Sequence, residues 1–99
     1  MNSIKNKISK IKELCELHNV DKLYVFGSVA KNQDKPESDI DFLVKFRPFD
    51  ITQYFDNYMN FKEKLVKLFQ KNVDLVEEQT LKNPILIDSI NNHKELIYG

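Results

Sequence analysis

Residues 38–44 read Ser-Asp-Ile-Asp-Phe-Leu-Val, and this stretch decides the expected fold. The apolar run Ile40–Phe46, stopped by Arg47 and Pro48, predicts a buried strand. Because side chains alternate along a strand, Asp39 and Asp41 point to one face, with Cα atoms about 6.5 Å apart. Two like charges held so close raise one another's pKa and destabilise a fold unless a cation intervenes. Oxygen ligands of this kind suit Mg²⁺ or Mn²⁺. The alternative is that Asp39 caps a turn and Asp41 lies exposed at a sheet edge.

A second strand is predicted at Leu23–Phe26, and it runs directly into Gly27 and Ser28. Glycine permits a tight turn and the close approach of a ligand. Ser28 offers a hydroxyl and a backbone N–H at the start of a possible short helix, where free donors and the helix dipole favour phosphate. Lys31 follows, and it either contacts phosphate or is a solvated surface lysine. For the glycine and serine, an ordinary turn with an N-cap is the alternative.

A third acidic side chain, Asp74, lies within the short apolar run Val73–Val76, which predicts another strand. An unpaired charge inside such a strand is costly. Asp74 therefore either caps the beginning of the strand in water or meets the other two aspartates. Neighbouring strands are about 4.8 Å apart, so a carboxylate at this position is close enough to share a metal ion with Asp41.

The rest of the chain predicts helices around these strands. Apolar residues at helical spacing indicate a helix from Ile4 to Leu17, with Cys15 in the core, and a longer helix from Ile51 to Gln70. Residues 84–92 predict a final helix, followed at 95–98 by a short extended tail or one more helical turn. This order predicts one α/β (α+β) domain over residues 1–99, with helices packed on a small mixed sheet of three or more strands.

The composition excludes several classes of protein. Fifteen basic and fifteen acidic side chains cancel, so no overall field would attract nucleic acid or an anionic membrane. A single cysteine excludes an internal disulfide framework. No stretch approaches the roughly 20 apolar residues that span a bilayer, and no signal-like apolar segment follows the first residues. We therefore expect a cytoplasmic protein that binds neither membranes nor nucleic acid directly.

Taken together, Gly27-Ser28, the stretch from Ser38 to Val44 and the run Val73–Val76 resemble the minimal nucleotidyltransferase (MNT) family of the DNA polymerase beta superfamily. The resemblance implies a small mixed sheet with helices packed on it. It also implies that Gly27 and Ser28 hold nucleotide phosphates, that Asp39 and Asp41 bind two Mg²⁺ ions, and that Asp74 completes one metal site and helps to activate the acceptor. Mn²⁺ is a possible substitute for Mg²⁺.

The same resemblance implies a partner and a reaction. Members of this family are often antitoxins of HEPN toxins, and some transfer AMP from ATP to a tyrosine of the toxin. Where the family frequently has arginine and glycine, this chain has Lys31 and Asn32, and lysine lacks the bidentate fork of arginine. A non-catalytic antitoxin that masks its partner is the second hypothesis. A nucleotidyltransferase that acts on a small molecule is the third.

Overall fold

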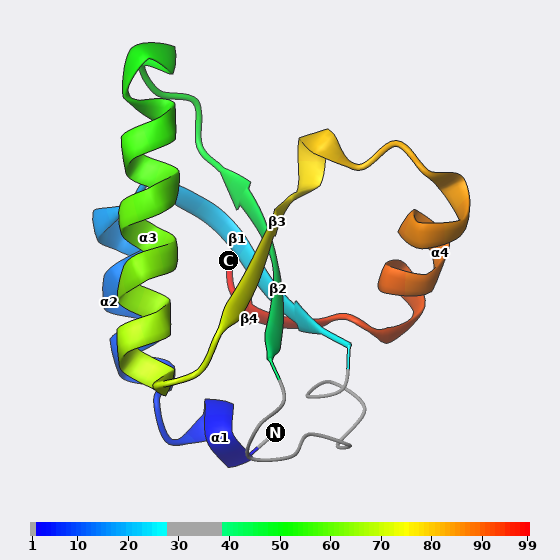
Figure 1. Cartoon of the computed structure of the whole chain (residues 1–99), viewed down its shortest axis with the longest axis horizontal. Coiled ribbons are helices and arrows are strands. Elements are labelled where there is room, and N and C mark those ends of the chain that lie inside the picture. Colours follow the sequence, from blue (N-terminus) through cyan, green and yellow to red (C-terminus); the bar gives the residue numbers. More distant parts are fainter. Residues whose placement is uncertain (1, 28–38) are drawn as a thin grey trace.

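A computed structural model describes residues 2–27 and 39–99. Within these residues, four strands form one sheet, with helices on both of its faces (Figure 1). Two short 3₁₀ turns, η1 (Ile51–Gln53) and η2 (Glu78–Thr80), follow β2 and β3. The longer elements are α1 (Asn2–Lys5), α2 (Ile8–Leu17), β1 (Val20–Phe26), β2 (Ile40–Phe46), α3 (Tyr54–Phe69), β3 (Val73–Glu77), α4 (Pro84–His93) and β4 (Glu95–Tyr98).

The sheet is mixed, with the strand order β3-β2-β1-β4. Strand β1 pairs antiparallel with both β2 and β4, whereas β2 and β3 are parallel. A parallel pair needs a crossover connection, and α3 supplies it. The predicted small mixed sheet is confirmed, and β3 and β4 form its two edges.

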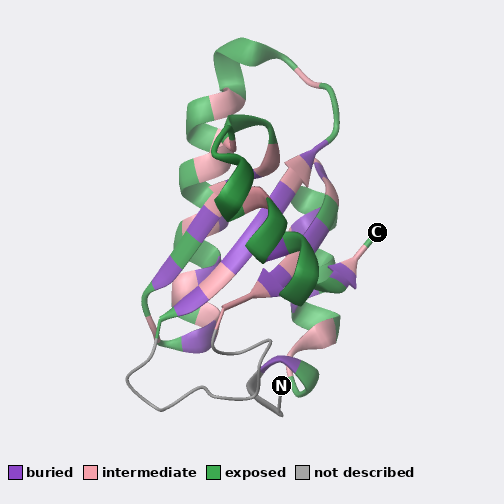
Figure 2. Ribbon diagram, turned by 90° about the vertical axis from the view of Figure 1, so that its right-hand side faces the viewer, coloured by how far each residue is buried: buried purple, intermediate pink, exposed green. Residues whose placement is uncertain are grey.

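The two faces of the sheet have different surroundings. One face packs on α2 and α3, and on this side Val25 and Phe42 are completely buried beside Phe61 and Leu65 of α3. The other face is partly covered by α4, which lies in front of the strands in Figure 2. Ile90 of α4 is the buried residue of that helix. The main core therefore lies on the α2–α3 side, and the α4 side is thinner.

Helix α3 supplies much of that core. Phe61, Leu65 and Phe69 recur at intervals of four and form its buried stripe. Asp50 caps the preceding 3₁₀ turn, because its Oδ1 accepts a hydrogen bond from the backbone N–H of Thr52 at 3.0 Å. The helix ends at Phe69, and the next residue, Gln70, adopts a left-handed conformation with φ 54°.

Some element boundaries differ from the prediction. The expected helix from Ile4 to Leu17 is divided into α1 and α2, because Lys7 departs from helical geometry with φ −123° and ψ 11°. The division lets Ile4 enter the core at 0% exposure. Strand β1 begins three residues earlier than expected, at Val20, where it pairs with Phe46 of β2. For residues 95–98 the sequence left two forms open, an extended tail or a helical turn, and the structure shows the extended one as β4.

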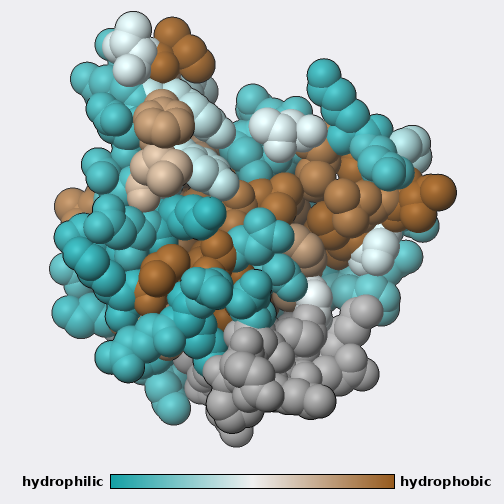
Figure 3. Space-filling view, in the orientation of Figure 1, coloured by the Kyte–Doolittle hydropathy of each residue, from teal (hydrophilic) through white to brown (hydrophobic). Residues whose placement is uncertain are grey.

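An apolar groove of about 410 Å³ runs along the edge strand β3, beside α3. Its lining includes Phe55 and Met59, which are 70% and 42% exposed, together with Val76 of β3. Figure 3 shows apolar side chains gathered in the hollow between α3 and the region of α4. In the described parts of the chain, no helix combines the length and apolar character that crossing a membrane requires.

The core assignment predicts unequal effects for two phenylalanines of α3. Phe61 is fully buried against the rings of His18 and Phe46, whereas Phe55 is 70% exposed. We expect Phe61→Ala to lower the free energy of unfolding by about 3–5 kcal/mol, through lost burial and a residual cavity. Phe55→Ala, the matched control, should change it by less than about 0.5 kcal/mol. Urea denaturation measures both, and equal effects would contradict the assignment.

Candidate nucleotide and metal site

Three acidic residues meet at one end of the sheet. Asp39 directly precedes β2, Asp41 is the second residue of β2, and Asp74 is the second residue of β3. The parallel register pairs Asp41 directly with Asp74. All three aspartates line one open pocket of about 400 Å³, which they share with Lys62, Val66, Asn72 and Val73. The structure therefore brings together the three carboxylates that the sequence singled out, while their roles stay predictions.

Strand alternation explains why these carboxylates face away from the core. Ile40 and Phe42 are completely buried on the α3 side, so Asp41 between them points to the opposite face. In β3, Val73 and Leu75 are buried in the same core, and Asp74 between them is exposed. Because laterally paired residues of a parallel ladder share a face, Asp41 and Asp74 lie side by side on the α4 side of the sheet.

The electrostatics of this cluster are unfavourable without a cation. Partial burial raises the pKa of Asp41 above its ordinary value, and the neighbouring charges of Asp74 and Asp39 raise it further. A set of carboxylate oxygens fits Mg²⁺ or Mn²⁺, and a divalent ion would relieve this repulsion. Among residues 2–27 and 39–99, no three acidic, histidine or cysteine side chains lie close enough to hold one ion as they stand. The three aspartates would have to reorient to share it.

Gly27 lies against this cluster, at the end of β1. Its φ of 74° falls in the left-handed region, where residues with a Cβ are strained. A Cβ built on Gly27 would also collide with Oδ2 of Asp41. Glycine is therefore needed here both for backbone conformation and for the close approach of the carboxylate. The other two predicted phosphate contacts, Ser28 and Lys31, lie outside the described residues.

The same end of the sheet carries a second pocket, which the sequence did not reveal. Phe26 pairs with Asp41 across β1 and β2, so Phe26, Asp41 and Asp74 form one row across three strands. Helix α4 packs beside Phe26 and brings Leu86, Ser89 and His93 to this row. Their spacing of three and four residues places them on one side of a helix. That spacing was a signal in the sequence, but nothing local connected residues 84–93 with Phe26.

The chain matches a known protein family over most of its length. The family described as "Polymerase beta, Nucleotidyltransferase" matches residues 9–99, which is most of the chain. The chain belongs to this nucleotidyltransferase family. Its fold is accordingly the polymerase beta-like nucleotidyltransferase fold, as the sequence resemblance implied.

A similar protein sequence and a similar solved structure both agree with this family assignment. A Methanocaldococcus jannaschii protein named "Putative protein adenylyltransferase MJ1379" is 34% identical over 101 residues, covering 92% of this chain and 96% of the relative. A solved structure described as "Structure of putative minimal nucleotidyltransferase" has a TM-score of 0.79 and 26% identity, covering 95% of this chain and 92% of its own.

A further solved structure contains a tri-AMPylated Shewanella oneidensis HEPN toxin in complex with MNT antitoxin. The matched chain has a TM-score of 0.66 and 20% identity, and the match covers 96% of this chain and 71% of that one. At this identity the likeness concerns the fold alone.

The contact between Gly27 and Asp41 can be tested by a double-mutant cycle. We expect Gly27→Ala to lower the free energy of unfolding by at least about 1 kcal/mol, through its positive φ and the collision with Asp41. In an Asp41→Ala background the cost should be smaller, because the collision is gone and the backbone strain remains. Urea denaturation measures all four proteins. Equal costs in both backgrounds would show that Asp41 does not pack against Gly27.

The raised pKa of Asp41 predicts a pH dependence of stability in metal-free protein. The folded state keeps this proton to higher pH than the unfolded chain, so stability falls as pH rises above about 4, where an ordinary aspartate titrates. We expect Asp41→Asn to flatten this fall and to stabilise the metal-free protein at neutral pH. Urea midpoints across the pH range measure the effect.

Asp50 provides a control of opposite sign for that experiment. Its hydrogen bonds with Thr52 lower the pKa of Asp50, so its stabilising contribution is lost as pH falls. Asp50→Asn should therefore weaken the loss of stability at low pH. It should leave unchanged the fall in stability that Asp41 causes as pH rises above about 4. A steeper fall at neutral pH in Asp41→Asn would contradict the repulsion inferred for the carboxylate cluster.

Proposed function

We propose that this nucleotidyltransferase transfers AMP from ATP to a hydroxyl of a partner protein. The observation that carries the proposal is the convergence of Asp39, Asp41 and Asp74 on one pocket, with Gly27 against Asp41. A bound polyphosphate needs its negative charge neutralised, and a divalent cation held by carboxylates would do this. It also needs close contact with the protein backbone, which a glycine allows. The nucleotidyltransferase family supplies the reaction class.

In this proposal the aspartates hold Mg²⁺, and Asp39 and Asp41 are its main ligands. The ion would supply charge neutralisation at the phosphates. The acceptor oxygen forms a bond to the α-phosphorus, the bond from that phosphorus to the oxygen bridging to the β-phosphate breaks, and pyrophosphate leaves with the bonding electrons. Asp74 accepts the hydroxyl proton in this proposal. The chain contributes mainly by positioning these groups.

Two observations support a protein as the acceptor. Asp74 lies on the edge strand β3, so the carboxylate pocket opens at a side of the sheet that no other described strand covers. The Methanocaldococcus jannaschii relative is named "Putative protein adenylyltransferase MJ1379", and the HEPN toxin in the solved antitoxin complex is AMPylated. We therefore infer an antitoxin of a HEPN-like toxin whose acceptor is a tyrosine hydroxyl.

The competing function is an antitoxin that silences its partner by covering it. The exposed apolar groove beside β3, with Phe55 and Met59, favours a binding surface of some kind. Masking would need this surface and no carboxylate cluster. The two functions differ in their dependence on Asp39 and Asp41.

Transfer of label decides between them. The protein is incubated with ATP labelled in the α-phosphate, Mg²⁺ and the product of the adjacent gene, and label on that partner is followed over time. We expect Asp41→Asn to slow transfer at least about 100-fold, because a metal ligand supports several kcal/mol of charge stabilisation. Asp88→Asn on the exposed side of α4 is the matched control and should transfer at the normal rate.

Chelation by EDTA should stop transfer, and Mg²⁺ or Mn²⁺ should restore it. Mass spectrometry of the labelled partner should locate AMP on a tyrosine. If the partner is silenced equally by Asp39→Asn, Asp41→Asn and the unaltered protein, with no label on it, masking is the function.

A further inference from the structure

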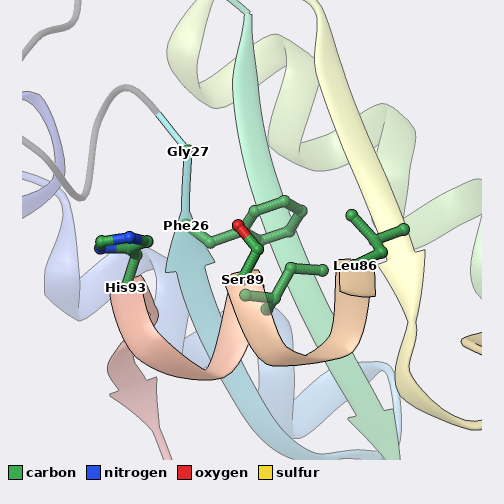
Figure 4. Close-up of a pocket in the computed structure, with 6 residues that line it drawn as sticks. Phe26, Gly27, Leu86, Ser89 and His93 are labelled. Atoms are coloured by element: carbon green, nitrogen blue, oxygen red, sulfur yellow. The ribbon is translucent and has the colours of Figure 1, made fainter. Parts of the chain in front are cut away.

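The pocket between β1 and α4 has the composition of a site for a flat ring. It has a volume of about 200 Å³ and is lined by Phe26, Gly27, Leu86, Ser89, Ile90 and His93 (Figure 4). In this view Phe26 points from β1 toward α4, whose side chains close the other side. Among the described residues, no carboxylate and no lysine or arginine lines this pocket. The side chains that line it are two aromatic rings, two branched aliphatic chains and one hydroxyl.

The position of the pocket connects it with the carboxylate site. Phe26 pairs with Asp41, and Gly27 lies both in this pocket and against Oδ2 of Asp41. With strands about 4.8 Å apart, the row from Phe26 through Asp41 to Asp74 spans about 10 Å. A ligand whose phosphates lie at Gly27 and Asp41 can therefore place its other end beside Phe26.

The lining chemistry matches a nucleobase. Proteins hold unstacked bases against aromatic and apolar side chains and hydrogen-bond to the base edges. The side chains of Phe26, Leu86 and His93 can pack against the flat face of a base. The hydroxyl of Ser89 and the ring nitrogens of His93 can hydrogen-bond to the edge of the base. The volume is below the roughly 300–1,000 Å³ of pockets that enclose a drug-sized ligand, so it suits one ring system rather than a whole nucleotide.

We propose that this pocket binds the adenine ring of the donor nucleotide, an inference that rests on the proposed function. The order Phe26, Asp41, Asp74 across the strands favours adenine over the acceptor side chain as the ligand of this pocket. Asp41 lies between Phe26 and Asp74, so the pocket is on the side of Asp41 away from Asp74. The acceptor hydroxyl approaches at Asp74, from the open edge of β3, and the base then lies at the other end of the row, between β1 and α4.

The test fills the pocket without disturbing the core. Ser89 is exposed on α4 and lines the pocket, so Ser89→Trp places a large side chain in it. Asn91→Trp is the matched control, because Asn91 is exposed on the same helix and two residues further round, on nearly its opposite side. Circular dichroism and urea denaturation should show both variants folded.

Adenosine and inorganic tripolyphosphate, each with Mg²⁺, are the two probes. In amide NMR spectra we expect adenosine to shift the signals of residues 86–93 and of Phe26 and Gly27 in the unaltered protein. Ser89→Trp should weaken adenosine binding at least about tenfold, since base stacking on aromatic side chains has that order of effect. Tripolyphosphate binding should stay within about twofold in Ser89→Trp, and Asn91→Trp should resemble the unaltered protein with both probes.

Three outcomes would overturn the proposal: no shifts at residues 86–93 with adenosine, equal adenosine binding by Ser89→Trp and Asn91→Trp, or shifts there with N-acetyltyrosinamide in place of adenosine. The last would make the pocket an acceptor site. None of these depends on AMP transfer, which the labelled-ATP experiment measures separately. Transfer without adenosine in this pocket would reject the base site alone, and adenosine binding without transfer would reject the proposed function alone.

Discussion

The parallel pairing of β2 with β3 sets two carboxylates side by side, and much of the molecule serves to hold them there. Asp41 and Asp74 would separate if either strand moved in register, and their mutual repulsion favours such movement. The opposing force comes from the other face of the same strands, where Phe42 and Leu75 are buried against α3. If either strand slipped by one residue, its own buried side chain, Phe42 in β2 or Leu75 in β3, would turn to the opposite face. Hydrophobic burial on one face thus fixes an arrangement of charges on the other.

This division gives the two faces of the sheet different tasks. The α2–α3 side contains most of the fully buried side chains, including Ile11, Phe61 and Leu65, and contributes most to stability. The α4 side carries the aspartates, the glycine contact and the small ring-sized pocket. Because α4 buries only Ile90, changes on this helix cost the core little. Such a layout allows ligand contacts to vary among related chains while the framework is kept.

Sequence patterns predicted strands β1, β2 and β3 and the meeting of the three aspartates at one pocket, for physical reasons, while the roles of these aspartates stay predictions. Strand β2 has the predicted limits because its alternation and Pro48 are local signals, and the same alternation placed Asp39 and Asp41 on one face. Long-range contacts explain the failures. Val20 joins β1 through its pairing with Phe46, and His93 joins a pocket through the packing of α4. Pairing with β1 also decides between the two forms left open for residues 95–98, in favour of the extended one. The roles of Ser28 and Lys31 stay predictions, since they lie outside the described residues.

The position of β4 has a consequence for how the protein is made. Strand β4 spans residues 95–98 of this sequence and pairs with β1, which begins at Val20. While the ribosome synthesises the preceding part, β1 therefore has one unsatisfied edge, although the segments that carry the aspartates have already been translated. Nζ of Lys94 also lies 4.3 Å from the centroid of the Tyr24 ring, a cation–π contact that joins the end of α4 to β1. This contact, too, forms only after residue 94 has been translated. The ring-sized pocket consequently takes shape only after residues 84–98 have left the exit tunnel, later than the segments that carry the aspartates.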